Sequence, residues 1–469
     1  MHNMIRFIIL FLLFTIIYQN NFAQIPYEQQ RQIDAVFAEW NRTDSPGGAL
    51  AIIKNGQILY KKGYGMADLE HGVPISSETV FYAGSVSKQF VAMCILLLHE
   101  QGKLSLDDKV KKYIPELHNY DTIITIRQMV HHISGLRDYL SLLGLSGRDY
   151  LDHIPKQMVL DMIFRQKELN FEPGTQYAYS NSGYFLLAEI IGRVSGKTLR
   201  QYADEHIFQP LGMTHSFFND NTYQIIPDRA FSYQRGANGI FTSLLMRFDL
   251  VGSGGLYTTV EDLYKWDQNF YKNKLGKAQQ SLIDTMLTEG KFNNGASCGY
   301  AFALSPGTYR GLPTYGHTGS LAGYRAYYVR FPKQIFSIIL LGNVAQFAPT
   351  GKAEAIADIL LADQLAAPTP DTNDSVPETP ITTPTYTAQD LQELPGKYYS
   401  EELNAYYNII LERNEIYIQA GYESKILLND FVKSGFYDII FLREGKRKAI
   451  SGMVLKAGLI KNIKFEKVE

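Results

Sequence analysis

The chain has 469 residues, of which 45% are hydrophobic and 20% are charged, a composition typical of globular proteins with a large core. Its formal net charge is −2, so no strong basic field is available to attract a nucleic acid, and that class of partner is disfavoured. The two cysteines, Cys94 and Cys298, are expected to be free thiols rather than a disulfide.

The first 23 residues have the features of a secretory signal peptide. Arg6 provides the positive flank, residues 7–17 form an apolar core, and the small residue Ala23 stands where cleavage is expected. The apolar run is short for a bilayer span. We therefore expect an exported protein, periplasmic or secreted, whose mature chain starts at Gln24; an uncleaved membrane anchor is the alternative.

The mature chain is expected to open with a helix followed by a β-hairpin. Apolar residues at positions 33, 36, 37 and 40 have helical spacing. Two apolar runs, 48–54 and 57–63, flank Asn55-Gly56, the dipeptide that most strongly indicates a two-residue hairpin turn.

Ser85-Val-Ser-Lys88 is the one Ser-x-x-Lys in the sequence, and it opens an apolar helix expected over 90–101. Positions three apart share a helix face, so the Ser85 hydroxyl and the Lys88 amine are predicted to meet at the helix N-terminus. A lysine held out of water can act as a base for a serine nucleophile. The spacing alone also arises by chance in a chain of this length.

Helical patterns fill the middle of the chain, and two strands return at 323–331 and 335–341 before a helix near 353–364. Strands at both ends of a helical middle predict an α+β domain with an antiparallel sheet flanked by helices. Residues 367–388 are rich in Pro and Thr and are predicted to be a linker. It would separate a domain of residues 24–366 from a small all-β domain, barrel or sandwich, of residues 389–469.

Two later segments could complete a site around Ser85. Tyr179-Ser-Asn181 offers a phenol that could act as a general base, and Gly316-His-Thr-Gly-Ser320 offers backbone N–H groups to an oxyanion. Each segment by itself is weak evidence for a catalytic site. The order of the segments along the chain and their surroundings carry more information than their composition.

Seven segments in this order resemble the serine β-lactamase and penicillin-binding-protein superfamily. The closer similarity is to the branch that holds class C β-lactamases, D-alanyl-D-alanine carboxypeptidases, D-aminopeptidases and related esterases. The segments are residues 81–90, 102–108, 126–136, 171–184, 210–213, 254–263 and 316–319. The resemblance implies a β-lactamase-like fold over about residues 27–365 and a serine hydrolase that works through an acyl-enzyme.

Carried over by position, the resemblance implies a role for each matching residue. Ser85 would be the acylated nucleophile, Lys88 would orient it and share its proton, and Tyr179 would be the general base. Asn181 would bind substrate or Lys88. The backbone N–H groups of Ser85 and Ser320 would form the oxyanion hole beside Thr318 and Gly319. The small all-β domain weakly resembles the lipocalin-like barrel of some members.

His317 departs from the pattern of class C β-lactamases, which have lysine there. A histidine with a pKa of about 6.5 attracts a substrate carboxylate less than a lysine does. This favours an ester or a D-amino-acid amide or peptide as substrate, with peptidoglycan fragments a further possibility. If His317 acts as a cation, activity should fall as the pH rises through its pKa.

Several readings stay open at this stage. Arg325 could recognise a carboxylate or be an outward strand residue, and His131 and His132 are interpreted as structural. No metal-ligand spacing and no cofactor motif is found, so none is expected. A true β-lactamase or carboxypeptidase and an inactive wall-binding or partner-binding scaffold are the alternative functions. The sequence does not determine the oligomeric state.

Overall fold

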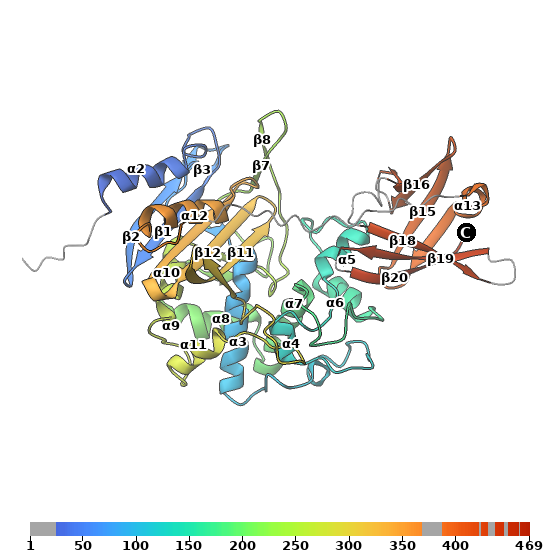
Figure 1. Cartoon of the computed structure of the whole chain (residues 1–469), viewed down its shortest axis with the longest axis horizontal. Coiled ribbons are helices and arrows are strands. Elements are labelled where there is room, and N and C mark those ends of the chain that lie inside the picture. Colours follow the sequence, from blue (N-terminus) through green and yellow to red (C-terminus); the bar gives the residue numbers. More distant parts are fainter. Residues whose placement is uncertain (1–24, 368–386, 422–423, 430–436, 445–448, 459) are drawn as a thin grey trace, which may run out of the picture.

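The structure is a computed structural model that describes residues 25–367, 387–421, 424–429, 437–444, 449–458 and 460–469. A large part with mixed helices and strands carries a smaller all-β part at its side (Figure 1). The expected signal peptide and most of the expected linker lie outside the described residues. No helix among the described residues is long and apolar enough to cross a membrane.

The large part is built on a six-stranded antiparallel sheet, ordered β10-β11-β12-β13-β1-β2. The strands are β1 (Gly48–Lys54), β2 (Gln57–Tyr64), β10 (Ser305–Tyr309), β11 (Leu312–Leu321), β12 (Tyr324–Phe331) and β13 (Phe336–Gly342). The first two and the last four are far apart in sequence and meet where β1 pairs with β13. The predicted α+β domain with an antiparallel sheet is therefore confirmed.

Each face of this sheet packs against a different core, as the period of two in a strand requires. Leu50 and Ile52 face a smaller cluster that includes Ile33 and Ile356. Ile33 belongs to α2 (Tyr27–Val36), and Ile356 belongs to α12 (Pro349–Leu360). The intervening residues of β1 face the larger cluster, which contains the helical lobe.

The helical lobe covers the second face of the sheet, and α3 (Lys88–Glu100) runs through its centre with eleven buried residues out of thirteen. The other helices are α4 (Ile126–Val130), α5 (Tyr139–Leu145), α6 (Lys156–Phe164), α7 (Asn181–Ser195), α8 (Leu199–Ala203), α9 (Gln209–Leu211), α10 (Val260–Asn269) and α11 (Gln280–Met286). Short turns of 3-10 or π type are η1 (Gly84–Ser87), η2 (Val110–Lys112), η3 (Asp204–Phe208) and η4 (Pro332–Gln334).

Besides these two layers, the described residues of the large part form three small sheets. They are β3 (Met66–Asp68) with β4 (Val73–Pro74), β5 (Phe81–Tyr82) with β9 (Leu256–Thr258) and β6 (Phe217–Phe218), and β7 (Tyr233–Arg235) with β8 (Phe241–Ser243). The β5–β9 pair brings the segment before Ser85 next to the segment around residue 254.

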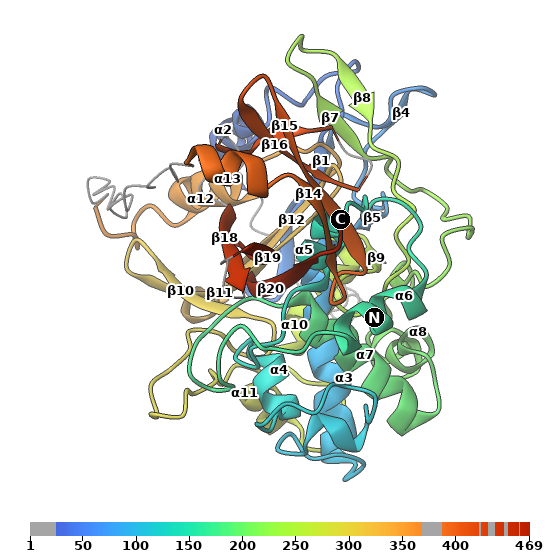
Figure 2. The ribbon, with the colours of Figure 1, turned by 90° about the vertical axis from the view of Figure 1, so that its right-hand side faces the viewer.

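The carboxyl-terminal part is one seven-stranded antiparallel sheet, ordered β17-β16-β15-β14-β20-β19-β18. Its elements are α13 (Ala388–Glu393), β14 (Gly396–Ser400), β15 (Ala405–Glu412), β16 (Glu415–Ala420), β17 (Ile426–Leu427), β18 (Tyr437–Glu444), β19 (Ala449–Ala457) and β20 (Ile460–Lys467). Figure 2 looks onto this sheet, in front of the rest of the chain. The predicted all-β unit is present, as a half-barrel.

Two helix caps matter for the site. The Ser180 side chain accepts a hydrogen bond from the N–H of Gly183 and caps α7, which therefore begins at Asn181. The Asp138 side chain accepts a hydrogen bond from the N–H of Ser141 and caps α5.

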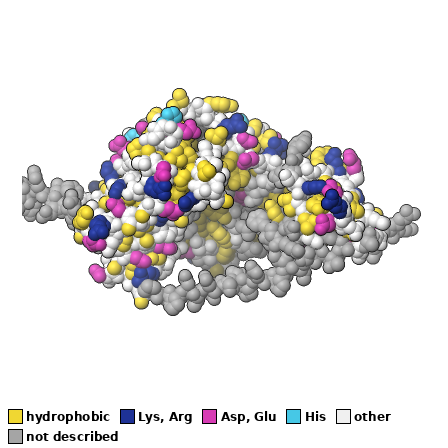
Figure 3. All heavy atoms as spheres, turned by 90° about the horizontal axis from the view of Figure 1, so that it is seen from above, with side chains coloured by type: hydrophobic (Ala, Val, Ile, Leu, Met, Phe, Trp, Pro, Cys, Tyr) yellow, Lys and Arg dark blue, Asp and Glu magenta, His cyan; other side chains and the backbone are white. Residues whose placement is uncertain are grey.

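On the surface, charges of both signs are interspersed across the face seen in Figure 3.

Candidate active site

Ser85 and Lys88 meet at the start of α3, as their spacing predicts. Ser85 lies in η1 and Lys88 is the first residue of α3. Lys88 Nζ is 3.0 Å from Ser85 Oγ. The two groups are therefore within direct proton-transfer distance.

The Lys88 side chain is completely buried, and two further oxygens hold its amine. Nζ donates to Asn181 Oδ1 at 2.9 Å and to the carbonyl oxygen of Ser253 at 2.6 Å. Burial lowers the pKa of Lys88 to about 7, while the charge of Asp138 opposes this shift. Near neutral pH a large fraction of Lys88 is thus the free amine, which is able to accept a proton.

Tyr179 lies beside this pair, in the loop before α7. Lys88 Nζ is 4.7 Å from the centre of its ring. Its hydroxyl is buried and makes no well-aligned hydrogen bond among the described residues, although the Ser85 hydroxyl is near enough to lower the phenol pKa. Burial has the larger effect and raises the pKa of Tyr179 well above 10. The resting site therefore favours a neutral phenol, and the phenolate base expected from the sequence stays a prediction.

His132 packs against Tyr179 with ring centres 4.2 Å apart. Its Nδ1 accepts a hydrogen bond from the N–H of Ser180 at 3.1 Å. The proton of the neutral ring is then on Nε2. Burial lowers the pKa of His132 well below 6.5, so the ring is neutral. Its carbonyl oxygen accepts a hydrogen bond from the N–H of Ala178 at 3.0 Å, so this histidine holds the backbone on both sides of Tyr179.

His317 is buried on β11, and both of its ring nitrogens are occupied. Nδ1 lies 2.6 Å from the carbonyl oxygen of Thr318, which can only accept, so Nδ1 carries the proton. Nε2 then accepts from the hydroxyl of Tyr300 at 2.9 Å. Burial, and secondly the charge of Lys88, lower the pKa of His317 to about 4. His317 is therefore neutral at physiological pH.

Two glycines let β11 cross η1 at close range. A Cβ on Gly319 would lie 2.0 Å from the carbonyl oxygen of Ala83 and 3.1 Å from the N of Ser85. A Cβ on Gly84 would lie 2.5 Å from the N of Ser320, and Gly84 has a φ of +55°. The backbone N atoms of Ser85 and Ser320, the predicted oxyanion hole, therefore both lie at this contact.

The remaining predicted residues are at the edge of the site. Arg325 pairs across the strands with Ser320, and its guanidinium donates to the carbonyl oxygens of Ala322 and Tyr324, both at 2.8 Å. No carboxylate of the described residues forms an ion pair with it. These contacts favour a role in holding the hairpin between β11 and β12.

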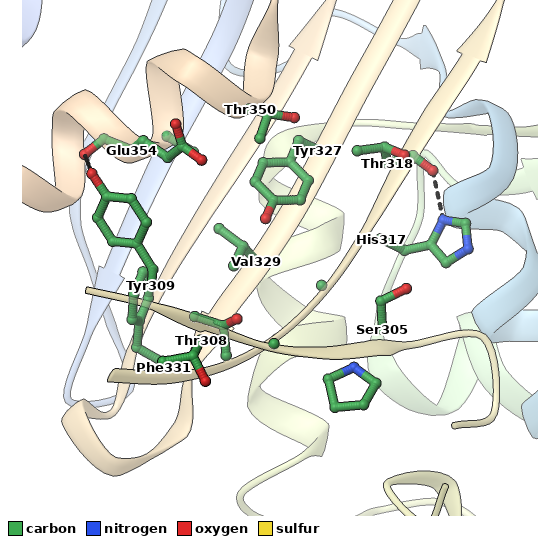
Figure 4. A pocket seen from close by; sticks show the side chains of 15 residues that line it. Ser305, Thr308, Tyr309, His317, Thr318, Tyr327, Val329, Phe331, Thr350 and Glu354 are labelled. Carbon is green, nitrogen blue, oxygen red and sulfur yellow. Dashed lines mark hydrogen bonds between the residues drawn. The ribbon is translucent and has the colours of Figure 1, made fainter. Parts of the chain in front are cut away.

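Thr318 lines a groove of about 310 Å³ between the sheet and α12. Figure 4 shows this groove with Tyr327, Val329 and Glu354, and with His317 at its edge. Lys88 and Ser85 are not among its lining residues, so it is distinct from the catalytic pair.

Sequence reasoning missed three groups that hold the site in place. The carbonyl of Ser253, the carboxylate of Asp138 and the hydroxyl of Tyr139 are contacts made across long sequence separations. Asp138 Oδ2 accepts from the N–H of Asn181 at 2.6 Å, and the Tyr139 hydroxyl is 2.9 Å from Ser253 Oγ. The one available signal was their position next to two of the matching segments, residues 126–136 and 254–263.

No group of three His, Cys, Asp or Glu side chains in the described part of the chain is arranged to hold a metal ion. Cys94 and Cys298 are both free. The groups that lie together at the site are a serine hydroxyl, a buried amine and a phenol.

Comparison with known proteins places this site in a family. The model of the Beta-lactamase family matches residues 33–363, which include every predicted catalytic residue. PbpX of Bacillus subtilis (strain 168), which carries the provisional name of a penicillin-binding protein, is 35% identical over 263 residues, 56% of this chain and 63% of its own. A D-aminopeptidase of Gluconobacter oxydans (strain 621H) is 26% identical over 326 residues, 70% of this chain and 61% of its own.

The chain thus matches about three fifths of the length of these two relatives. Among solved structures, the octameric penicillin-binding protein homologue from Pyrococcus abyssi has a TM-score of 0.62 at 24% identity, covering 93% of this chain and 97% of the other. That likeness concerns the fold, and its extent includes the carboxyl-terminal sheet. The chain therefore belongs to the beta-lactamase family, the superfamily of serine hydrolases that its motifs predicted.

Proposed function

We propose that this protein is a serine hydrolase that forms an acyl-enzyme on Ser85. One observation carries the proposal: the buried, partly neutral amine of Lys88 lies 3.0 Å from Ser85 Oγ and is held there by Asn181 and Ser253. A serine needs a base within hydrogen-bond reach and with a pKa near the working pH, and Lys88 meets both conditions.

Acylation begins when Ser85 Oγ attacks the carbonyl carbon of the substrate and its proton passes to Lys88 Nζ. The carbonyl electrons move to oxygen, and the N–H groups of Ser85 and Ser320 stabilise the resulting oxyanion. When the tetrahedral intermediate collapses, the bond to the leaving group breaks. The Tyr179 hydroxyl gives its proton to the leaving oxygen or nitrogen and recovers one from Lys88, whose ammonium is nearby.

Deacylation repeats these steps with water as the nucleophile. Water loses a proton to the neutral amine of Lys88 or through Tyr179, and its oxygen attacks the ester carbonyl in the same oxyanion hole. The bond to Ser85 Oγ then breaks, and the proton returns to that oxygen. The acid product leaves and the hydroxyl of Ser85 is restored, so the catalytic groups end in their starting states.

The substrate we propose is an ester or a D-amino-acid amide or peptide. His317 is neutral and both its nitrogens are engaged, so it provides no cation for a substrate carboxylate. β-Lactams and peptidoglycan C-termini carry such a carboxylate, whereas esters and amino-acid amides do not. The similarity to D-aminopeptidases supports the same choice.

The test combines labelling with a substrate panel. Wild type and Ser85→Ala are incubated with a fluorophosphonate and analysed by mass spectrometry, and a single adduct on Ser85 of wild type is expected. Turnover of p-nitrophenyl esters, D- and L-amino-acid p-nitroanilides and nitrocefin is then measured. Absence of the adduct and of all turnover would favour the inactive scaffold.

The second candidate function is that of a β-lactamase or D-alanyl-D-alanine carboxypeptidase. It is favoured by the similarity to PbpX. Nitrocefin turnover far above ester and anilide turnover would establish this function in place of the first one. Peptidoglycan fragments would then become the expected natural substrates.

We further propose that the protein is exported. The support is the charged, apolar and small-residue pattern of residues 1–23. Mass spectrometry of the protein recovered from the exported fraction should give a mature chain that begins at Gln24. A full-length chain found only inside the cell would contradict export.

A further inference from the structure

The carboxyl-terminal sheet reaches the large domain through the side chain of Arg137, which is fully buried. Its Nη1 donates to Glu402 Oε1 at 2.6 Å, and its Nη2 donates to the carbonyl oxygen of Lys461 at 2.7 Å. Both acceptors belong to the carboxyl-terminal part. Glu402 is 4% exposed and also accepts from the N–H of Lys167 at 2.8 Å. This cation and this carboxylate are therefore matched across the two parts of the chain.

Other contacts across this boundary are less enclosed or do not involve a charge pair. The Tyr407 hydroxyl donates to the carbonyl oxygen of Leu145 at 2.8 Å. Lys464 forms an ion pair with Glu168 at 2.7 Å, but both side chains remain well exposed to solvent. Exposed pairs contribute little, so the Arg137–Glu402 pair is the contact whose loss has the largest local effect.

The residues that follow Arg137 in the chain lead directly into the active site. Asp138 accepts from the N–H of Asn181, and the Tyr139 hydroxyl hydrogen-bonds to Ser253 Oγ. The carbonyl oxygen of Arg137 itself accepts from the hydroxyl of Ser182 at 2.6 Å. Three consecutive residues thus connect the boundary with two separate segments of the site.

Those two segments contain the groups that hold the catalytic amine. Lys88 Nζ donates to the side chain of Asn181 and to the carbonyl of Ser253. Asp138 fixes the backbone of Asn181, and Tyr139 fixes the side chain of Ser253. A shift of the 137–139 segment would therefore displace both acceptors of Lys88 at once and change its distance from Ser85.

We propose that the carboxyl-terminal sheet is a working part of the active site, and that Glu402 and Arg137 are positioning residues that set the place of Lys88. The proposal rests on the proposed acyl-enzyme chemistry, since it concerns the base of that reaction. Glu402 touches neither substrate nor Ser85, and it acts through Arg137, the 137–139 segment and the two acceptors.

The experiment measures single-turnover acylation of the full chain by a p-nitrophenyl ester or by the fluorophosphonate. Glu402→Ala removes the acceptor of Arg137 and should lower the maximal acylation rate about tenfold or more, with the half-saturating concentration unchanged. Glu402→Gln keeps an oxygen at the same length and should restore most of that rate. Circular dichroism and thermal melting check that each variant is folded.

Tyr407→Phe is the matched control, because it removes a hydrogen bond at the same boundary that does not pass through Arg137. Its acylation rate should stay close to that of wild type. An equal loss in Tyr407→Phe and Glu402→Ala would overturn the proposal in favour of general undocking. Folded Glu402→Ala with wild-type acylation would overturn it outright.

If Glu402→Ala does not fold, the proposal is tested with the double variant Arg137→Met/Glu402→Leu. This variant is used because an apolar pair can replace a buried ion pair without leaving a lone charge. Its maximal acylation rate should fall as predicted for Glu402→Ala, and a wild-type rate would overturn the proposal. Failure of the proposed function is recognised separately, because wild type itself would then form no adduct on Ser85.

Discussion

The hydroxyl of Tyr300 donates a hydrogen bond to Nε2 of His317 at 2.9 Å and so occupies the unprotonated nitrogen of the ring. Because Nδ1 is bound to the carbonyl of Thr318, His317 is a neutral acceptor between two fixed partners. The position that carries a lysine in class C β-lactamases therefore carries no charge here near neutral pH. The missing charge therefore affects which substrate is preferred, whereas the chemistry of acylation does not depend on it.

Substitution of His317 tests this preference. His317→Lys introduces a buried cation beside the site, so the ratio of nitrocefin to p-nitrophenyl ester turnover, compared as kcat/KM, should rise about tenfold or more. His317→Gln is the uncharged control and should leave the ratio near that of wild type. An unchanged ratio in a folded His317→Lys protein would show that charge at this position does not select the substrate.

The pH dependence of the acylation rate should follow the protonation state of the Lys88 amine. Its pKa is lowered to about 7 by burial, and the free amine is the active form, so the rate should rise through about pH 7 and level off above it. His317, with a pKa of about 4, should give no descending limb between pH 5 and 8. Stopped-flow ester acylation between pH 5 and 9 measures this profile, and a rate that falls as the pH rises through 6.5 would contradict it.

The lowered pKa of Lys88 also predicts how the free energy of unfolding changes with pH. Its pKa is about 7 in the folded chain, whereas an ordinary lysine has a pKa of 10.5, so the unfolded chain binds more protons between these pH values. The free energy of unfolding contributed by Lys88 should therefore increase as the pH rises from 7 towards 10.5. The difference in urea unfolding between wild type and Lys88→Met isolates this contribution, and a difference that does not change with pH would exclude it.

Removal of the Tyr179 hydroxyl should separate activity from stability. Tyr179→Phe loses the group that protonates the leaving group, and kcat for an amide substrate should fall about 10² to 10⁴-fold. The buried hydroxyl has no well-aligned partner among the described residues, so Tm should stay the same or rise slightly. Steady-state kinetics and a melting curve on the same preparation test both parts. A large fall in Tm would indicate that the hydroxyl has a structural role instead.

The crossing of β11 over η1 should tolerate no side chain. Gly319→Ala would place a Cβ 2.0 Å from the carbonyl oxygen of Ala83, so the two backbone segments must separate. We expect a loss of about 1–3 kcal/mol in the free energy of unfolding and a strong loss of acylation, because the Ser85 and Ser320 N–H groups move apart.

Gly351→Ala in α12 is the control for this substitution, since nothing lies within 4 Å of its added Cβ. It should be neutral or stabilising by about 0.4–1 kcal/mol, with unchanged acylation. Equal behaviour of the two variants in denaturant and in the acylation assay would refute the close approach.

Features that depend on neighbours along the chain follow from the sequence alone. Ser85 and Lys88 are about one helical turn apart, so their meeting follows from the local geometry of η1 and the start of α3 once this segment forms. The hairpin at Asn55-Gly56 has the two positive φ angles that this dipeptide favours. The strand-like runs near the carboxyl terminus, with turn residues between them, likewise predicted an all-β unit.

Features that depend on burial and on distant partners arise only when the chain is packed. The pKa of Lys88 falls because α3 lies in the centre of the lobe, and Ser253 reaches it from 165 positions away. The hydroxyl of Tyr300 occupies Nε2 of His317 through a contact that no local pattern encodes. Desolvation and long-range hydrogen bonds are properties of the packed chain, so the motif order determined the family, while packing decided the charge state of each group in the site.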